Sequence, residues 1–329
     1  MKILVTGAAG FIGSHLCERL LEINDIEVVG IDGFINPALI QTKQRNLKLL
    51  LTNPRFRFHQ VDLRQADLAG LLDGVQVVYH LAAMPGVRTS WGTDFQDYVD
   101  HNIVATQILL EAAREYPLKK FIYISTSSVY GEKKGKVAED SIPTPLSPYG
   151  VSKLTGEYLC KVYQASYGIP LVILRYFTLF GPRQRSDMAF HRFIKGILQR
   201  EPITIYGNGT QTRDFTFIRD CVEATVAVLY AEGVIGETIN IGGRERASIL
   251  EVISILEYIL NKKATLDFVE RLKGDPMDTW ADISKANSLL NYNPVCSLKT
   301  GLEEQINDIR NGSVPTANKD HIIHKKSST

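Results

Sequence analysis

Hydrophobic residues follow two patterns in the first half of the chain. Short runs rich in valine, isoleucine and phenylalanine alternate with longer segments in which apolar residues recur every three or four positions, as in 11–23 and 103–116. The short runs predict β-strands and the longer segments predict helices. Such alternation is typical of a parallel sheet covered by helices on both faces, which binds ligands at the carboxyl ends of its strands. The predicted strands are Ile3–Thr6, Glu27–Ile31, Phe56–Gln60, Gln76–His80, Phe121–Ser125 and Leu171–Arg175.

The pattern changes after Phe180-Gly-Pro182, where shorter strands and helical segments follow one another. We expect a smaller α/β lobe at residues 181–312 that closes over a doubly wound domain at 1–180, with 235–245 returning to the large sheet. Residues 313–329 are polar and unpatterned, so we expect a disordered tail. In the smaller lobe the predicted helices are 190–200, 220–232 and 248–260, and the predicted strands are 202–206, 237–241 and 264–269.

Composition and charge narrow the class of protein. The chain has 329 residues, 44% of them hydrophobic and 22% charged, which suits a soluble globular protein with a sizeable core. A net charge of +1 gives no electrostatic reason for a nucleic-acid partner, and no apolar run is long enough for a membrane span. A strand follows Met1-Lys2 at once, so we expect no signal peptide.

Cysteines and histidines give no metal or disulfide pattern. The four cysteines are scattered, which favours free thiols in a reducing cytoplasm. His321 and His324 have a spacing that resembles a metal site, but a solvated tail is the better interpretation. We therefore expect a cytoplasmic protein without a metal ion.

A glycine-rich turn follows the first predicted strand. Gly7, Gly10 and Gly13 allow a tight turn, a close approach of the backbone to a pyrophosphate, and packing of the next helix against the strand. The N-terminus of that helix presents unpaired N–H groups and the positive end of its dipole to phosphates. The turn predicts a dinucleotide site, although similar turns also occur as plain structural corners.

Asp32 ends the second predicted strand, about 20 residues after the turn, where an acidic side chain accepts hydrogen bonds from a ribose hydroxyl. Its charge repels a 2′-phosphate, and Gly33 adds no cation that would offset this repulsion. The sequence therefore favours NAD over NADP. Asp62, at the end of the third strand, is a weaker candidate for the adenine edge. A solvated carboxylate at a strand end is the alternative for both residues.

Tyr149 and Lys153 are four residues apart and so share one helix face. Free tyrosine is a poor base at neutral pH, because its pKa is near 10. A nearby ammonium and the positive nicotinamide ring favour the phenolate. The pair follows the serine- and threonine-rich stretch 125–128, which ends a predicted strand at the same sheet edge as the glycine turn. Together these features predict oxidation of an alcohol by a nicotinamide cofactor.

These motifs resemble the extended short-chain dehydrogenase/reductase superfamily, and the resemblance runs over residues 1–310. Within it the chain is similar to the nucleotide-sugar epimerases, decarboxylases and dehydratases. The resemblance implies a Rossmann-type domain with NAD, a catalytic Thr126 beside Tyr149, and a UDP- or dTDP-sugar held by the smaller lobe. It also implies a homodimer formed by helices near 94–116 and 149–167. The cofactor-binding residues it implies are Gly7, Gly10, Phe11, Ile12, Gly13, Asp32, Asp62, Leu63, Leu81, Ala82, Ala83, Asn102, Tyr149, Lys153 and Tyr176.

The segment Ala82–Arg88 resembles the loop that lies against the sugar in UDP-glucuronate 4-epimerases. Related decarboxylases and dehydratases carry an acidic residue after the catalytic threonine, where this chain has Ser127 and Ser128. Hydroxyls there and at Thr178 can hydrogen-bond a substrate carboxylate without repelling it. We therefore expect interconversion of UDP-glucuronate and UDP-galacturonate through a 4-keto intermediate, with NAD tightly bound.

Three alternatives remain open. A UDP-glucose/galactose 4-epimerase shares every catalytic residue. A UDP-glucuronate decarboxylase is disfavoured by Ser128. An inactive NAD-binding sensor on the same fold is disfavoured because Tyr149, Lys153 and Thr126 are all intact.

Arginines of the smaller lobe are candidates for the diphosphate, because guanidinium forks match phosphate oxygens. Arg213 lies in an Arg-Asp-Phe motif of the family, and Arg185 is a second candidate. Arg271 is displaced by one residue from the position of a phosphate-binding arginine in the family. The sequence therefore does not decide whether Arg271 or Lys273 contacts the diphosphate. Salt bridges are the alternative for the arginines, and core packing is the alternative for Phe190. The substrate-binding residues that the resemblance implies are Pro85, Gly86, Arg88, Thr126, Ser127, Ser128, Thr178, Arg185, Ala189, Phe190, Ile205, Tyr206 and Arg213.

Overall fold

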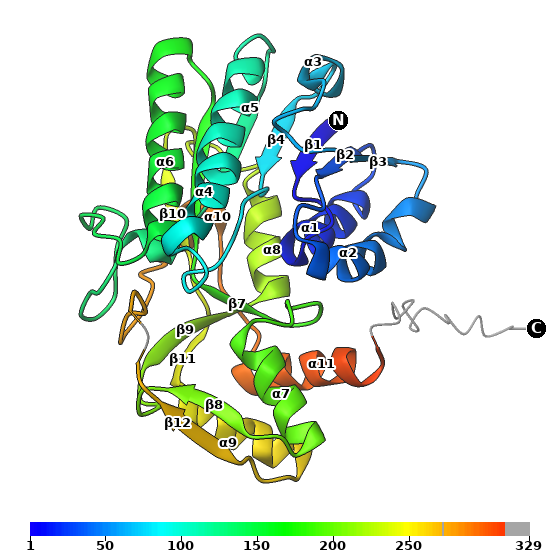
Figure 1. The fold of residues 1–329 in the computed structure, drawn as a ribbon. Coiled ribbons are helices and arrows are strands. Elements are labelled where there is room, and N and C mark those ends of the chain that lie inside the picture. Colours follow the sequence, from blue (N-terminus) through cyan, green and yellow to red (C-terminus); the bar gives the residue numbers. More distant parts are fainter. Residues whose placement is uncertain (272, 313–329) are drawn as a thin grey trace, which may run out of the picture.

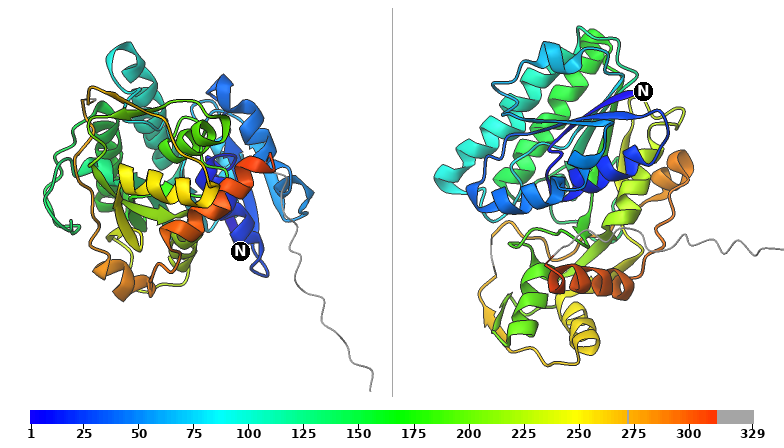
Figure 2. Two further views of the ribbon diagram at one scale, coloured as in Figure 1. Left: turned by 90° about the horizontal axis from the view of Figure 1, so that it is seen from below. Right: turned by 90° about the vertical axis from the view of Figure 1, so that its right-hand side faces the viewer.

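The computed structural model describes residues 1–271 and 273–312, which fold into a larger and a smaller lobe (Figures 1 and 2). The tail predicted at 313–329, with His321 and His324, lies outside the described residues. None of the helices in the described part of the chain has the length and apolar character needed to cross a membrane.

A seven-stranded sheet forms the centre of the larger lobe, in the order β10-β6-β5-β4-β1-β2-β3. Every pair of neighbouring strands in it is parallel. The predicted parallel α/β class is therefore confirmed. The strands are β1 (Lys2–Thr6), β2 (Glu27–Asp32), β3 (Phe56–Gln60), β4 (Val77–His80), β5 (Lys120–Thr126), β6 (Leu171–Tyr176) and β10 (Thr238–Ile241).

Helices cover both faces of this sheet (Figure 1). One hydrophobic cluster joins the sheet to α1 and α8 through residues such as Leu16 and Val222, and a second joins it to α3, α5 and α6 through Leu72, Leu109 and Cys160. The helices of this lobe are α1 (Phe11–Leu21), α2 (Ile40–Leu47), α3 (Leu68–Leu72), α4 (Phe95–Tyr98), α5 (Ala105–Ala113), α6 (Pro148–Tyr167), α8 (Ile218–Ala227) and α10 (Ser284–Leu290). Shorter helical turns are η1 (Pro37–Leu39), η2 (Leu50–Thr52), η3 (Gly92–Asp94), η4 (Val99–Val104) and η5 (Ser127–Val129).

The smaller lobe holds two small sheets with helices packed beside them (Figure 2). Its three-stranded sheet has the order β11-β9-β7, and β12 pairs with β8 in parallel. Rings from β7, β9 and α7 meet in its core, where the centroids of Phe190 and Phe215 are 4.6 Å apart. Its elements are β7 (Thr178–Phe180), β8 (Ile203–Tyr206), β9 (Thr212–Phe217), β11 (Glu245–Ser248), β12 (Leu266–Val269), α7 (Ala189–Gln199), α9 (Ile249–Leu260) and α11 (Leu298–Arg310).

The strand order reverses between β1 and β4, which lie side by side although β2 and β3 separate them in the chain. A parallel sheet binds its ligands at the carboxyl edge near such a reversal, because the connections there leave in opposite directions. The glycine turn follows β1, and the serine-rich stretch follows β5. Both therefore lie at the edge that faces the smaller lobe.

Candidate active site

The glycine turn has the geometry that only glycine permits. Gly7 has a φ of +72°, and a Cβ added to Gly13 would lie 2.1 Å from the carbonyl oxygen of Gly7. Helix α1 begins at Phe11, and no side chain caps the N–H groups at its start. These groups are free to bind an anion at the positive end of the helix dipole. The backbone of Phe11 and Ile12 thus lies at the opening of the helix.

Asp32 lies beside this turn at the end of β2. Its carboxylate accepts hydrogen bonds from the backbone N–H of Ala9 at 3.3 Å and of Phe34 at 3.0 Å. The ammonium of Lys43, from α2, donates to the same carboxylate at 2.6 Å. Gly33, the next residue in the chain, carries no charge, so the sequence alone predicted no cation beside Asp32. Lys43 arrives from the next helix, so its position beside Asp32 depends on the fold.

Asp62 and Leu63 follow β3. Burial raises the pKa of the Asp62 carboxyl, but hydrogen bonds and charge from Arg64 outweigh this effect and hold the pKa below its usual value. Arg64 also donates to Asp100 at 2.8 Å. Leu63 is buried in the core between the sheet and α3. The structure therefore places Asp62 in an ion-pair cluster at the sheet edge, while the side chain of Leu63 faces the interior.

Residues after β4 are tied to α6. The amide of Asn102, in η4, accepts from the N–H of Met84 at 2.6 Å and donates to its carbonyl at 3.0 Å. It also donates to the hydroxyl of Ser152 at 2.9 Å. Ala82 donates its N–H to the hydroxyl of Thr6 at 3.0 Å, which joins this loop, with Leu81 and Ala83, to the end of β1. The loop therefore has a defined position beside the glycine turn.

Three predicted residues direct their side chains into the interior. The hydroxyl of Tyr176 lies 2.6 Å from the hydroxyl of Thr225, in the interior next to α8. Phe190 and Ile205 are buried in the core of the smaller lobe. Their side chains pack in the interior, so contact of these residues with a ligand is restricted to their backbone.

Tyr149 and Lys153 lie in the first two turns of α6. Pro148 is the first residue of this helix, and the hydroxyl of Ser147 caps it by accepting from the N–H of Gly150 at 3.1 Å. Gly150 lies so close to η5 that an added Cβ would be 2.6 Å from the carbonyl oxygen of Ser128. The start of α6 and the serine-rich stretch are thus in direct contact.

The Tyr149 phenol is in an environment that disfavours its ionisation in the free protein. Burial raises its pKa, while hydrogen bonding by the Thr126 hydroxyl and the charge of Arg185 lower it. The ring of Tyr98 packs edge-on against the ring of Tyr149, with centroids 6.1 Å apart. From the sequence, Lys153 is the expected source of a lowering charge, and the structure adds Arg185 as a second cation that lowers this pKa.

Lys153 is buried beneath the tyrosine. Burial lowers the pKa of its ammonium to about 8, and the thiol of Cys160 and the carboxylate of Glu157 oppose this shift. The ammonium lies over the ring of Tyr123, 4.2 Å from its centroid. A lysine with this pKa is close to its titration point near neutral pH.

A buried ion pair anchors α6 to the sheet. Glu157, one turn after Lys153, accepts hydrogen bonds from Arg175 of β6 at 2.6 and 2.9 Å and from the Ser125 hydroxyl of β5 at 2.5 Å. Glu157 is 1% exposed and Arg175 is 3% exposed. The ion pair ties α6, which carries Tyr149, to β6, and the hydrogen bond from Ser125 ties it to β5, which carries Thr126. Sequence reasoning missed Glu157, although its spacing of four from Lys153 was a visible signal.

The loop around Gly86 is held by a second tyrosine. Gly86 has a φ of +121°, and its carbonyl accepts a hydrogen bond from the Tyr98 hydroxyl at 2.9 Å. The same hydroxyl donates to the carbonyl of Pro85 at 3.2 Å and lies 2.7 Å from the hydroxyl of Thr89. Tyr98 therefore supports both the ring of Tyr149 and the loop predicted to contact the sugar.

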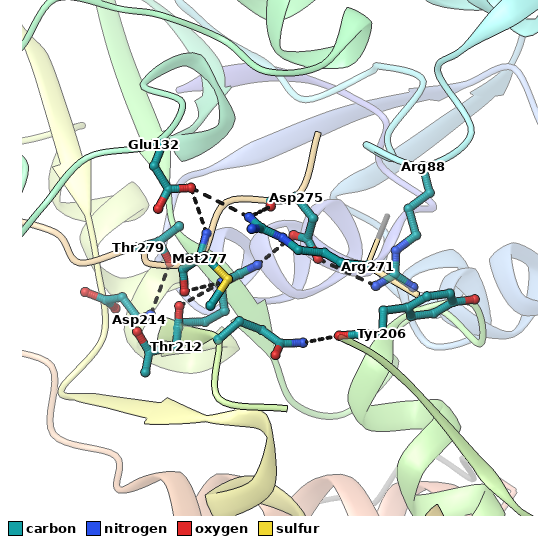
Figure 3. A network of polar contacts seen from close by, with 11 residues as sticks. Arg88, Glu132, Tyr206, Thr212, Asp214, Arg271, Asp275, Met277 and Thr279 are labelled. Atoms are coloured by element: carbon teal, nitrogen blue, oxygen red, sulfur yellow. Dashed lines mark hydrogen bonds and ion pairs between the residues drawn. The ribbon is translucent and has the colours of Figure 1, made fainter. Parts of the chain in front are cut away.

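Three of the arginines named from the sequence come together around one aspartate (Figure 3), and Arg185 is not among them. Arg213 Nη2 donates to Asp275 Oδ1 at 2.6 Å, and Arg88 Nη2 lies 3.8 Å from Asp275 Oδ2. The Arg88 guanidinium also lies over the ring of Tyr206, 4.3 Å from its centroid. Arg271 donates to the backbone carbonyl of Asp275 at 2.5 Å. Three arginines thus surround Asp275, which sequence reasoning did not single out.

The remaining predicted residues lie on either side of this group. Arg185 forms a bidentate ion pair with Asp187, with N–O distances of 2.8 and 2.9 Å. Thr178 is half-buried in β7, directly after the core residue Phe177. Ala189 is the first residue of α7 and is also half-buried. Within the described residues, no group of three or more histidine, cysteine or acidic side chains is arranged to hold a metal ion.

Comparison with known proteins assigns this arrangement to a family. The model of the NAD dependent epimerase/dehydratase family matches residues 3–242. The chain belongs to this family.

Similar epimerase-family proteins cover nearly the whole chain. YtcB of Bacillus subtilis, described as an uncharacterized UDP-glucose epimerase, is 60% identical over 306 residues, which span 93% of this chain and 97% of that protein. A UDP-glucuronate 4-epimerase of Thermodesulfobacterium geofontis is 40% identical over 309 residues, spanning 92% and 94%. The structure of UDP-glucuronic acid 4-epimerase from Bacillus cereus, in complex with UDP-glucuronic acid and NAD, matches with a TM-score of 0.94 and 59% identity, covering 94% and 99%.

Membership of this NAD-dependent family confirms the enzyme class that the sequence predicted. It also confirms the Rossmann-type fold, since the matched residues include the glycine turn and both Tyr149 and Lys153. The substrate differs between the names of the relatives, so it requires a separate argument.

Proposed function

We propose that this protein is a UDP-glucuronate 4-epimerase, which interconverts UDP-glucuronate and UDP-galacturonate with a bound NAD. The observation that carries the proposal is the hydroxyl-rich stretch beside Tyr149. Thr126, Ser127 and Ser128 are half-buried and adjoin the start of α6, and none of them is acidic. A substrate carboxylate can accept hydrogen bonds there without repulsion from a protein carboxylate.

The glycine turn and its surroundings suit NAD. The absence of Cβ atoms at Gly7 and Gly13 leaves the backbone open to a pyrophosphate, and the uncapped start of α1 supplies N–H donors. Asp32 is the acceptor for the ribose hydroxyls, and its bond from Ala9 places it against the turn. Lys153 holds the nicotinamide ribose. When bound, NAD supplies the acceptor and the donor for the hydride at C4.

Tyr149 moves the proton in this reaction. Its phenolate takes the proton of the sugar's 4-hydroxyl. It returns the proton after the 4-keto sugar has rotated about its diphosphate linkage and presents its opposite face. The Thr126 hydroxyl and the charge of Arg185 both favour the phenolate. Thr126 also positions the 4-hydroxyl beside the phenol. A buried base of this kind contributes roughly 10²–10⁴-fold to a proton transfer.

The UDP group lies between the lobes in this proposal. Arg88, from the larger lobe, and Arg213, from the smaller lobe, converge on Asp275 and can bind the diphosphate from two sides. The family resemblance implies that Tyr206, whose ring lies under the Arg88 guanidinium, and the backbone of Phe190 contact the uracil. In this proposal, few charged side chains hold the sugar itself in one position. This suits a site that must accept both sugar orientations.

A neutral-sugar epimerase is the second candidate. The Bacillus subtilis relative, which is 60% identical, is described as an uncharacterized UDP-glucose epimerase. Hydroxyl side chains can also bind a neutral hydroxymethyl group at C6. The two candidates differ in what occupies the space near Ser127, Ser128 and Thr178.

A homodimer fits the surface of the larger lobe. Val151, Tyr158, Val162 and Tyr167 of α6 are between 45% and 58% exposed, and Val104 beside α5 is 38% exposed. The helices α5 and α6 lie side by side at one edge of the lobe (Figure 1). Exposed apolar residues on two adjacent helices suit a four-helix interface between two copies. Light scattering of the purified protein at about 10–100 µM tests this assembly.

The substrate is tested by incubating the protein with UDP-glucuronate and following the products by NMR without added cofactor or reductant. The expected product is UDP-galacturonate. Formation of UDP-xylose or a 4-keto pentose would mean that decarboxylation wins, and the hydroxyl argument is then wrong. Turnover of UDP-glucose with no change in UDP-glucuronate would instead assign the protein to neutral sugars.

A further inference from the structure

A cavity of about 300 Å³ lies outside the proposed active site and is lined by residues of α2 in the larger lobe and of α7 and α11 in the smaller lobe. Arg45 of α2 lines one side. His191 and Lys195, four residues apart on one face of α7, line another, and Asp308 of α11 completes the set of charged or titratable residues. The volume is at the lower end of the range for small-molecule sites, roughly 300–1,000 Å³.

Two cations at this cavity have no partner. In residues 1–271 and 273–312, neither Arg45 nor Lys195 forms an ion pair or a side-chain hydrogen bond. The Arg45 Nε donor is buried and has no acceptor. The guanidinium of Arg45 is therefore not neutralised by an acceptor within the described residues.

The charged groups also act on one another. Burial lowers the pKa of His191, Lys195 and Arg45 lower it further, and Asp308 raises it. These groups therefore share one electrostatic environment. Asp308 offsets one positive charge, and the Arg183 backbone N–H already donates to its carboxylate at 2.8 Å. Two cations against one carboxylate leave the cavity with a net positive charge.

We propose that this cavity binds a phosphorylated small molecule, with Arg45 and Lys195 as the main contacts to its phosphate. A guanidinium fork and an ammonium supply several donors to a tetrahedral group that carries multiple acceptor oxygens. The volume exceeds that of a bare phosphate ion, and the apolar side chains of Leu198 and Ile309 line the remainder. A phosphate ester therefore fits the cavity better than inorganic phosphate.

This site is separate from the proposed nucleotide-sugar site, because none of its lining residues belongs to that set. The inference consequently does not depend on the identity of the sugar. The cavity is built from both lobes, so a bound ester would connect α2 directly to α7 and α11.

Calorimetric titration of the full-length protein tests the inference. Inorganic phosphate and glycerol 3-phosphate are titrated separately, each with NAD and saturating UDP present so that the nucleotide site is occupied. Both should bind, and the ester should bind more tightly. The R45Q/K195Q double variant should weaken ester binding at least about tenfold, the loss expected for one charge-assisted contact. Lys48→Gln, which removes an exposed charge from the end of α2, should leave the affinity within about twofold.

Two results would overturn the proposal. One is the absence of binding by either probe at millimolar concentration. The other is equal affinity in the wild type and the double variant, which would place the phosphate elsewhere. Lys195 is exposed, so Lys195→Gln alone should fold normally and weaken binding if the double variant proves unstable. Tighter binding of inorganic phosphate than of the ester would identify the free ion as the ligand.

Discussion

Arg213 and Asp275 form an ion pair at 2.6 Å, and the same carboxylate lies 3.8 Å from Arg88. Arg213 belongs to β9 of the smaller lobe, and Arg88 follows β4 of the larger lobe. Asp275 therefore joins the two lobes through Arg213, a candidate for the diphosphate, and Arg88, which the family resemblance places among the substrate-binding residues. The guanidinium of Arg213 is 11% exposed and is also held by the carbonyl of Thr212 at 2.8 Å. It is thus already oriented in the free protein.

Replacing Arg213 should weaken binding of UDP. Arg213→Gln removes a charged fork, and a hydrogen bond to a charged group contributes about 1.5–3 kcal/mol, so the Kd for UDP should rise roughly 10–100-fold. Titration calorimetry measures the change, and Arg244→Gln, at an exposed arginine, is the matched control. An unchanged Kd would mean that Arg213 serves only as the structural partner of Asp275.

Replacing Arg185 should shift the pH dependence of the reaction. The charge of Arg185 lowers the pKa of Tyr149, so Arg185→Gln leaves the phenol with a higher pKa. The phenolate is the active base, and the rising limb of kcat/KM should therefore move to higher pH. The loss of activity should be largest near neutral pH and shrink as pH rises.

Profiles of kcat/KM measured from about pH 6 to about pH 10 would show this shift. Arg192→Gln, on the neighbouring helix α7, is the control and should leave the limb in place. A uniform loss of activity at all pH values would contradict the electrostatic role and indicate a contact with substrate.

The sequence predicted the parallel sheet well, because each of its buried strands is a short apolar run between turn residues. The strand Phe56–Gln60 matches the prediction at both ends, β5 is one residue longer than predicted at each end, and the others differ by one residue at one end. The short strands β7, β9 and β11 were missed. Strand β9 contains the charged pair Arg213-Asp214, whose partners Asp275, Gly243 and Ala281 come from distant segments, so no local pattern marks it as buried.

The candidate site was predicted only in part, for the same reason. Motifs with fixed spacing, such as the glycine turn and Tyr149 with Lys153, are local and could be read directly. The partners Lys43 and Asp275 occupy their positions because the chain folds, and their spacing from Asp32 and Arg213 carries no signal. The start of the predicted helix 103–116 was also wrong, because the wider turn η4 occupies Val99–Val104 and carries Asn102.

Adding a carboxylate beside Tyr149 should discriminate between charged and neutral sugars. Ser128→Glu places a negative charge where a substrate carboxylate is expected, and like charges in a partly buried site repel by roughly 1–3 kcal/mol. The KM for UDP-glucuronate should therefore rise at least about fivefold, while the KM for UDP-glucose changes little.

Steady-state kinetics with both nucleotide sugars measure this difference, and Ser141→Glu, in the segment that precedes α6, controls for the added charge. Equal effects on both sugars would show that the substitution disturbs the site as a whole. The hydroxyl account of the carboxylate site would then lose its support.

The buried ammonium of Lys153 should make stability depend on pH. Its folded pKa of about 8 lies below the value near 10.4 of an unfolded lysine. Between these values the unfolded chain binds a proton that the folded protein does not, so the free energy of unfolding rises with pH in this window. A pKa shift of this size corresponds to a change in the free energy of unfolding on the order of 3 kcal/mol. The folded protein gains all of this stability only above the pKa of the unfolded lysine.

Urea unfolding of the protein freed of nucleotide, compared with Lys153→Met, isolates this contribution. Methionine carries no charge, so the stability of the wild type relative to the variant should increase between pH 8 and 10. Lys161→Met, farther along α6 and exposed, should show no such window. A difference between wild type and Lys153→Met that is constant with pH would mean that the ammonium is hydrated in the folded protein. In that case the proximity of Lys153 to Tyr123 would not reflect a desolvated charge.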